Sequence, residues 1–375
     1  QIAGSIVNEK DEEIDQVTVT VNSPTINPFA RVFNGFFDFL SIPMHNDITV
    51  TAEKDLGYLN GVSTSDLVLL QRHILGVKTL NSPYKMIAAD ANHDEKVDTR
   101  DMLHVSRLIL GIYNELPNVD SWKFIDKTHT FVNPTSPWGF PEAINYTSLD
   151  GDAQADFIGV KMGDLTGNAK ATNLLGTDDS TVGDMTMAIN DASINAGQSH
   201  TIEFTAKDFN DFTGYQLSIE LASGVTFERA DVGVLPNHSE GNFGLNRLAD
   251  GVITTNWANA DAVNLEDGAV LFSITVNAAS DVNVSEAIQV TSAVTAAEAY
   301  NSDLERFGIN TQFNRTEANF ALYQNAPNPF SAETQIGFQL DKAGTASLKL
   351  MDVSGRVLKQ INGTYTAGYH QITLN

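Results

Sequence analysis

A duplicated segment in the first third of the chain constrains the fold more than any other feature. The stretches VSTSDLVLLQRHILGV (62–77) and VDTRDMLHVSRLILGI (97–112) align at an offset of 35 residues, with matched Val, Thr, Asp and Arg and a shared ILG ending. Apolar residues follow helical spacing in both copies, and Gly76 and Gly111 stand where a left-handed residue ends a helix. Because repetition at a fixed offset indicates duplicated units, the sequence predicts two similar helices, each preceded by a loop.

The loop before the second helix, DANHDEKVDTRD (90–101), has oxygen-bearing side chains at the spacing of a twelve-residue calcium loop. The predicted ligands, at positions 1, 3, 5, 7, 9 and 12, are Asp90, Asn92, Asp94, the Lys96 carbonyl, Asp98 and Asp101. Glu95 at position 6 and Asp at position 12 differ from the Gly and Glu of an EF-hand. The alternative is a solvated acidic turn in a chain with 47 Asp and Glu residues, but the repeat register favours a calcium loop.

The loop before the first helix, DLGYLNGVSTSD (55–66), is a degenerate copy. It offers four candidate ligands, Asp55, Asn60, Ser63 and Asp66. Gly57 and Leu59 occupy the third and fifth positions, so either backbone carbonyls replace those ligands or calcium is held weakly.

Composition excludes several classes of function. The net charge of −25 repels nucleic acid and anionic membranes and favours divalent cations. The absence of cysteine excludes disulfides, thiolate zinc sites and a cysteine nucleophile. An extracellular protein without disulfides would need another stabilising element, for which bound calcium is a candidate. No run reaches the length of a membrane helix, and the residues QIAGSIVNEKDEE predict no signal peptide.

The remainder of the chain has the alternation and turn spacing of β structure. We predict a mainly β, multi-domain fold of β-sandwich and jelly-roll modules with a small α calcium module. The predicted parts are a β-sandwich (1–52), the repeat module with an irregular extension (53–172), a linker (173–184), a β jelly roll (185–315) and a last β unit (320–375).

The repeats resemble a dockerin of type I, a tandem of two calcium loops and helices, over about 65 residues. This resemblance implies Ca²⁺ as the cofactor and a cohesin as the partner, bound through the helix faces. Arg72, His73 and Arg107 are the partner-binding candidates that it implies. In the extension, ADFIGVKMGDLTGN resembles a segment that follows such repeats in large secreted proteins, and Asp164 there is expected in a turn.

Three further resemblances are weaker or more local. The first fifty residues are similar to prealbumin-like modules of bacterial surface proteins. GYQLSIELASGVTFERADVG, NFGLNRLADGVITTNWANA and LEDGAVLFSITVNA resemble a cohesin, a nine-stranded jelly roll, against the alternative of an immunoglobulin-type spacer. YQNAPNPF and MDVSGRVL resemble the C-terminal sorting domain of type IX secretion, two of whose usual strands we expect to be missing.

These features predict a secreted, calcium-stabilised, non-catalytic protein of the cell surface. Its modules would dock within one chain or between chains, with a filament as one outcome of the second geometry. The chain has no HExxH, GxSxG, P-loop or GxGxxG motif, and we expect no enzyme. Two alternatives are the accessory region of a large secreted enzyme and a carbohydrate-binding adhesin in which Trp257, with Phe243 and Asn256, stacks on a sugar.

Overall fold

The computed structural model describes residues 1–172, 180–314, 320–325, 328, 333–352 and 354–374. Residues 1–189 and 193–313 form one compact unit, and residues 190–192 with 314–375 form a second. Strands far outnumber helices, which confirms the prediction of a mainly β fold with a small helical region. The linker predicted over 173–184 lies largely outside the described residues.

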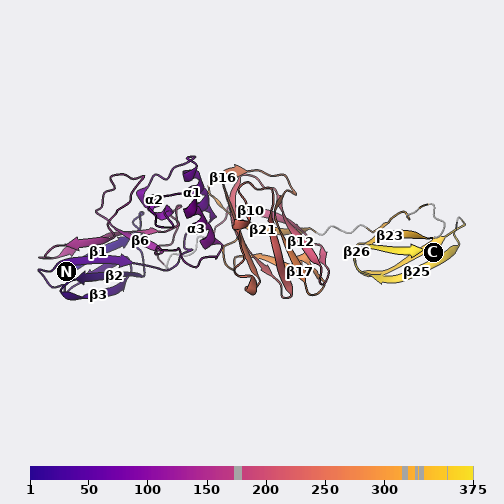
Figure 1. Cartoon of the computed structure of the whole chain (residues 1–375), viewed down its shortest axis with the longest axis horizontal. Coiled ribbons are helices and arrows are strands. Elements are labelled where there is room, and N and C mark those ends of the chain that lie inside the picture. Colours follow the sequence, from indigo (N-terminus) through magenta and orange to yellow (C-terminus); the bar gives the residue numbers. More distant parts are fainter. Residues whose placement is uncertain (173–179, 315–319, 326–327, 329–332, 353, 375) are drawn as a thin grey trace. The chain divides into compact units, whose positions relative to one another are not determined.

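Two facing sheets form the N-terminal sandwich, and alternation along the strands explains their packing (Figure 1). In β1 and β2 every second side chain is buried, which gives one core that includes Ile6, Val19 and Phe157. One sheet has the order β4-β1-β9-β6 with β8 beside β1, and the other has the order β3-β2-β5-β7. The strands are β1 (Ile2–Val7), β2 (Val17–Ser23), β3 (Ile26–Phe33), β4 (Phe36–Phe39), β5 (Ile48–Glu53), β6 (Trp122–Asp126), β7 (Ala143–Tyr146), β8 (Ala153–Gln154) and β9 (Phe157–Lys161).

The sandwich is larger than the predicted 1–52. Strand β9 pairs with β1 and β6, and β7 pairs with β5, so the segment predicted as an irregular extension completes both sheets. The reason is that these strands are short and interrupted by the turn-rich stretch NPTSPWGFPEA, which hides their alternation. The repeat module is therefore inserted between the two parts of the sandwich.

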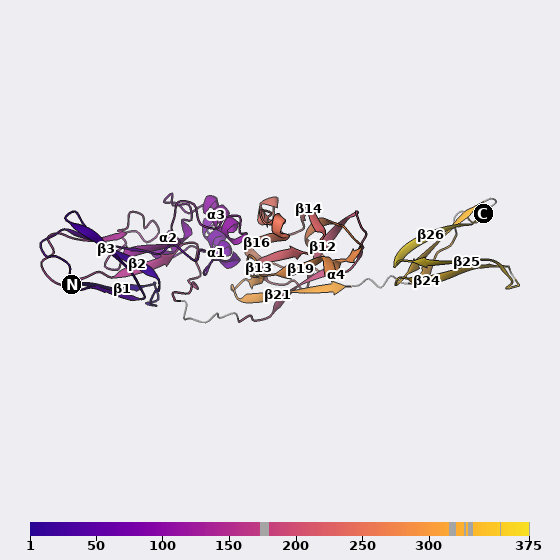
Figure 2. The same cartoon turned by 90° about the horizontal axis from the view of Figure 1, so that it is seen from below.

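The duplicated segments form the helices α1 (Thr64–Ile74) and α3 (Thr99–Ile109), which lie side by side (Figure 2). Each helix begins with a capping box, Ser63 with Asp66 in α1 and Asp98 with Asp101 in α3. Gly76 and Gly111 have φ of 70° and 65°, so both predicted left-handed helix ends are confirmed. A third helix, α2 (Pro83–Ala89), was not predicted, and it packs with the other two around a shared core.

The large β domain, which we define as residues 180–313, has one ten-stranded sheet that curls around a single core. The order of these ten strands is β14-β17-β12-β10-β21-β20-β13-β16-β15, with β19 beside β13. Strands β11 and β18 form a separate two-stranded sheet. The strands are β10 (Asp184–Asn190), β11 (Ser193–Ile194), β12 (Ser199–Lys207), β13 (Phe212–Leu221), β14 (Val225–Val232), β15 (Phe243–Gly244), β16 (Val252–Val263), β17 (Val270–Ala278), β18 (Val282–Asn283), β19 (Ile288–Thr291), β20 (Glu298–Asn301) and β21 (Arg306–Asn314). The short helices are α4 (Val284–Ala287) and the 3-10 turns η1 (Glu240–Asn242) and η2 (Leu248–Asp250).

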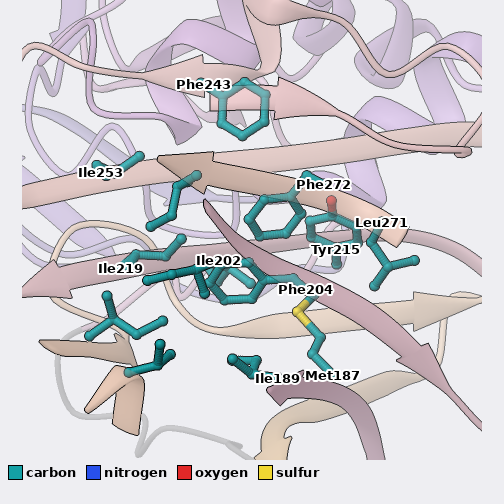
Figure 3. Packing of buried hydrophobic residues seen from close by; sticks show 14 of the residues in the cluster. Met187, Ile189, Ile202, Phe204, Tyr215, Ile219, Phe243, Ile253, Leu271 and Phe272 are labelled. Carbon is teal, nitrogen blue, oxygen red and sulfur yellow. The ribbon is translucent and has the colours of Figure 1, made fainter. Parts of the chain in front are cut away.

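Aromatic side chains dominate the core of the large β domain. Phe204 and Phe272 stack with ring centroids 4.4 Å apart, and Tyr215 lies against Phe272 (Figure 3). All three are fully buried. Such packing fixes the two faces of the sheet, so the outer face of β13 and β16 is a rigid platform.

The second compact unit contains two small sheets, β22-β23-β26 and β24-β25. Its strands are β22 (Ala321–Leu322), β23 (Thr334–Leu340), β24 (Gly344–Met351), β25 (Val357–Tyr365) and β26 (Gly368–Leu374), all within the stretch predicted as the last β unit. The motifs YQNAPNPF and MDVSGRVL include residues outside the described part of the chain, so the resemblance to a sorting domain stays a prediction.

Candidate docking and calcium sites

Backbone N–H groups orient the carboxylates of the second loop. Asp90, at the end of α2, accepts from Asp94 N at 3.0 Å and from Glu95 N at 2.9 Å. Asp101, in the first turn of α3, accepts from Asp98 N at 2.8 Å and from Asn92 N at 3.3 Å. The predicted first and last ligands are therefore fixed inside the loop by the fold of the loop itself.

The electrostatics of this loop fit a bound cation. Asp94 Oδ1 is buried without a hydrogen-bond partner, while Asp94 Oδ2 lies 2.8 Å from the Arg100 guanidinium. Burial raises the pKa of Asp90, and it raises the pKa of Asp101 to about 6. In the part of the chain that the structure describes, no three His, Cys, Asp or Glu side chains converge as a metal-binding group. The loop instead combines carboxylates with the Asn92 amide and the Lys96 carbonyl, oxygen donors of the type that calcium prefers.

Calcium binding at this loop is expected to weaken in acid. Calcium must displace the proton that Asp101 takes up with a pKa of about 6, so affinity falls roughly tenfold per pH unit below that value. The stability of the metal-free protein should change with pH in the opposite direction. Because the folded-state pKa lies above the unfolded value of 3.8, the destabilisation by the Asp101 charge is complete above pH 6 and disappears as the pH falls. The difference in melting temperature with and without calcium should thus shrink from pH 7.5 to pH 5. A constant difference would contradict this assignment.

Glu95 adopts the backbone conformation that a glycine normally supplies in such loops. Its φ is 62°, at the sixth loop position. A left-handed conformation costs an ordinary residue about 1–2 kcal/mol, and the entropic disadvantage of glycine is only roughly 0.5–1 kcal/mol. We expect Glu95→Gly to raise the free energy of unfolding by about 0.5–1 kcal/mol in urea titrations. The control Lys96→Gly, next to it and without a positive φ, should lower it instead.

The predicted ligands of the first loop are occupied by donors of this chain. Asp55 accepts from the Tyr58 hydroxyl and from Ser121 N, the latter at 2.9 Å. Asn60 exchanges two hydrogen bonds with the backbone of Lys170, at 2.8 and 2.9 Å. The Ser63 hydroxyl contacts Ser65 Oγ at 2.7 Å. These three side chains therefore do not converge as a ligand shell.

Asp66 is wholly buried and receives three backbone N–H groups. Leu165 N and Thr166 N donate to Oδ1 at 2.8 and 3.0 Å, and Ser63 N donates to Oδ2 at 2.8 Å. Burial, with the charge of Asp164 as the second cause, raises the pKa of Asp66 to about 7. All three hydrogen bonds favour the ionised carboxylate and oppose the effect of burial. The two loops thus differ, because the first also receives donors from a distant segment, at Leu165 N and Thr166 N.

Of the three predicted partner-binding residues, the structure places one against the large β domain. Arg72 on α1 is 9% exposed, and its Nε donates to Ala260 O at 2.8 Å and its Nη2 to Ser302 O at 3.0 Å. His73 instead accepts from Leu80 N at 3.0 Å, within the repeat module. Arg107 donates to the Tyr113 hydroxyl at 2.8 Å and lies over the Tyr113 ring.

The N-terminus of α1 makes the second contact with the large β domain. Thr64 N donates to Gln216 Oε1 at 2.7 Å, and both residues are buried. Sequence reasoning missed Gln216, because a polar residue within an apolar strand has no local signature of a partner. Its side chain satisfies one of the N–H groups that a helix leaves unpaired at its start.

The C-terminal end of α3 makes the third contact. Thr254 Oγ1 donates to Leu110 O at 2.6 Å, and Asn246 Nδ2 donates to Gly111 O at 2.7 Å. These two carbonyls belong to the helix end, where intrahelical partners run out. Ser106 and Asn256 add a side-chain bond at 3.1 Å. The large β domain therefore caps both helices, α1 at its start and α3 at its end.

Two glycines of the large β domain allow the helices to approach its strands. A Cβ on Gly214 in β13 would lie 2.7 Å from Thr64 Cγ2 and 2.8 Å from Trp257 O. A Cβ on Gly244 in β15 would lie 2.2 Å from Thr254 Oγ1 and 2.7 Å from Leu110 O. Gly214 lies inside strand β13, and a glycine within a strand is a sequence signal of close backbone approach.

Trp257 does not form a sugar-stacking surface. Its ring is fully buried in the core of the large β domain, and its Nε1 donates to Pro236 O at 2.7 Å. Phe243 and Asn256 are buried as well. The adhesin alternative therefore loses the aromatic platform on which it depended.

Comparison with known families identifies the repeat module. Residues 60–110 match the dockerin type I domain, a family that typically binds calcium and whose bearers are typically extracellular. The match covers α1, α2, the second loop and α3, but less than half of the chain. No helix among the described residues has the length and apolarity needed to cross a membrane. No curated protein matches the chain.

Solved structures that resemble the chain are of the cohesin type. A type I cohesin–dockerin complex from Clostridium thermocellum matches with 15% identity and a TM-score of 0.29, over 34% of this chain and 94% of that one. A non-cellulosomal cohesin from Archaeoglobus fulgidus matches with 16% identity and a TM-score of 0.26, over 34% and 86%. A type II cohesin from Bacteroides cellulosolvens matches with 14% identity and a TM-score of 0.27, over 35% and 97%. At such scores the resemblance remains a likeness, and no role of those proteins is transferred from it.

Proposed function

We propose that the chain is a non-catalytic interaction protein whose dockerin-type module docks onto its own cohesin-like large β domain. The observation that carries this proposal is the buried Arg72 guanidinium, which donates to Ala260 O and Ser302 O. Both acceptors belong to the same chain, 188 and 230 residues away. In the alternative geometry, docking between chains, Arg72 would donate to the same two carbonyls of a second copy.

The contacts have the character of a specific interface. The planar guanidinium of Arg72 donates to two carbonyl oxygens. Gln216 accepts from a backbone N–H at the start of α1, and Thr254 and Asn246 donate to backbone carbonyls at the end of α3. Burying such groups without partners would cost about 1–3 kcal/mol each. The polar pairs therefore select one docked arrangement in addition to stabilising it.

Because the two modules belong to one chain, a separate cohesin or dockerin competes poorly with their docking. Two modules on one chain meet at an effective concentration on the order of 1 mM, far above that of a separate partner in solution. A free cohesin or dockerin would have to displace the internal contact. We therefore propose a structural role, in which docking joins the modules of one surface protein, in preference to recruitment of other chains.

Calcium has a local role in this proposal. Asp90, Asn92, Asp94, Asp98 and Asp101 would hold the ion with the Lys96 carbonyl, and the ion would neutralise their charges. The loop leads directly into α3, whose end is capped by Thr254. Holding the loop would therefore hold the start of α3 while the large β domain holds its end.

The dependence of mass on concentration tests the proposal. Light scattering over a wide range of protein concentration should give the mass of a single chain, with and without calcium. Growth of dimers or longer oligomers with concentration, reversed by dilution, would show docking between chains and favour the filament. Chelation should lower the melting temperature, and the variant Asp94→Ala should be insensitive to chelation.

Export by type IX secretion, attachment to the cell surface and the lack of catalysis belong to the same proposal. Their support is the resemblance of residues 320–375 to a sorting domain and the absence of the common catalytic motifs from the sequence. A role as the accessory part of a secreted enzyme remains the alternative. A catalytic domain encoded on the same chain would favour it.

A further inference from the structure

Lys161 is a buried cation that contacts the first loop. It is the last residue of β9, and 4% of its surface is exposed. Its ammonium donates to Tyr58 O at 2.8 Å and to Met162 O at 3.0 Å, and it lies 5.9 Å from the centre of the Tyr58 ring. Tyr58 belongs to the degenerate loop 55–66, so the ammonium is held by a carbonyl of that loop.

Carboxylates of the first loop and its surroundings partly offset the effect of burial on this charge. Burial lowers the pKa of Lys161 to about 7, and the charges of Asp164, Asp66 and Asp55 oppose that shift, in this order of strength. Lys54, which is ion-paired with Asp15 at 3.0 Å, is the cation that adds to the shift. The charges of these three carboxylates thus favour the protonated form of the buried ammonium.

The segment 161–170, which we call the clasp, packs against the first loop. Asp164 accepts from Gly167 N at 2.7 Å and from Ala169 N at 2.8 Å, which folds the segment into a compact turn. The same turn presents its N–H groups at 165 and 166 to Asp66. At the other side of the loop, a Cβ on Gly61 would lie 2.5 Å from Ala169 Cα, so the turn packs directly on the loop.

We propose that Lys161 is the resident cation of the first loop, and that with the clasp 161–170 it replaces the metal ion there. The ammonium supplies positive charge to the surroundings of Asp66, Asp164 and Asp55, and backbone N–H groups of the clasp donate to Asp66 and Asp164. The loop leading into α1, the helix that carries Thr64 and Arg72, is then stable without calcium. This inference does not depend on docking, since all of these groups lie outside the large β domain.

The test combines a count of bound calcium ions with a double-mutant cycle on Lys161 and Asp66. Calcium titration by calorimetry should find a single ion in the wild-type protein, and Asp94→Ala should remove it. Lys161→Met should lower the melting temperature equally with calcium and with chelator, and should do so less in an Asp66→Asn background, because the carboxylate to be neutralised is then gone. Lys123→Met is the matched control. Lys123 lies on β6, the strand beside β9, and its ammonium makes an ion pair at 3.0 Å with the half-exposed Glu142.

A second ion in the wild-type protein that persists in Asp94→Ala would overturn the proposal. Strictly additive effects of Lys161→Met and Asp66→Asn would also overturn it, because they would show that the two groups do not interact. If Lys161→Met does not fold, the wild-type ion count decides alone. The docking proposal is tested by separate measurements, so its failure would leave these readouts unchanged.

Discussion

Replacing Arg72 with alanine is expected to destabilise the docked unit by about 2–4 kcal/mol, because the buried Ala260 O and the partly buried Ser302 O lose a charged donor. Native-state hydrogen exchange should show faster exchange in α1 and in β16, the two elements that Arg72 joins. Urea unfolding would give the size of the loss.

The duplication supplies the control for this experiment. Arg107 occupies the equivalent place in the second repeat, 35 residues on, but donates to the Tyr113 hydroxyl of its own module. Arg107→Ala should therefore cost less than about 1 kcal/mol and leave exchange in β16 unchanged. Equal effects of the two substitutions would contradict the assignment of Arg72 to the interface.

Adding a side chain at Gly214 is the second prediction with a large effect. A Cβ there meets Thr64 Cγ2 at 2.7 Å and Trp257 O at 2.8 Å, and Val68 Cγ2 at 3.5 Å, so Gly214→Val must push α1 away from β13. Overpacking of this kind costs about 1–3 kcal/mol or more. We expect lost protection at Thr64 N, the donor to Gln216, and a lower melting temperature.

Two comparisons separate docking from strand effects. Gly344→Val places the same side chain in β24, where a Cβ meets nothing within 4 Å, and should be nearly neutral. Gly214→Ala should cost less in a Thr64→Ala background, which removes the clashing methyl group. If the Thr64 background makes no difference, the cost arises inside the sheet and not at the docked helix.

The local parts of this structure could be predicted from the sequence. The period of the apolar residues located α1 and α3, and the glycines at their ends located the left-handed turns, because both features depend only on near neighbours. The strands of the large β domain followed from alternation and turn residues in the same way. The second loop was predicted from ligand spacing, which is also local.

The parts of the structure that depend on contacts between distant residues could not be predicted from the sequence. Strand β9 joins the sandwich by pairing with β1, and nothing in either strand specifies a partner some 150 residues away. The first loop was proposed as a weaker metal site, since its pattern could not show that the N–H groups at 165 and 166 would bind Asp66. The docked interface depends on backbone carbonyls such as Ala260 O, which every residue has and no pattern marks.

An engineered disulfide tests most directly whether the modules dock within one chain. The protein has no cysteine, so Gly111→Cys with Val294→Cys would introduce its only thiols. A Cβ on Gly111 lies 4.0 Å from Val294 Cβ, within the span of about 3.5–4.5 Å that a disulfide bridges. After mild oxidation in dilute solution, docking within the chain predicts a cross-linked monomer that migrates differently from its reduced form. Disulfide-linked dimers, or thiols that stay reduced, would contradict it.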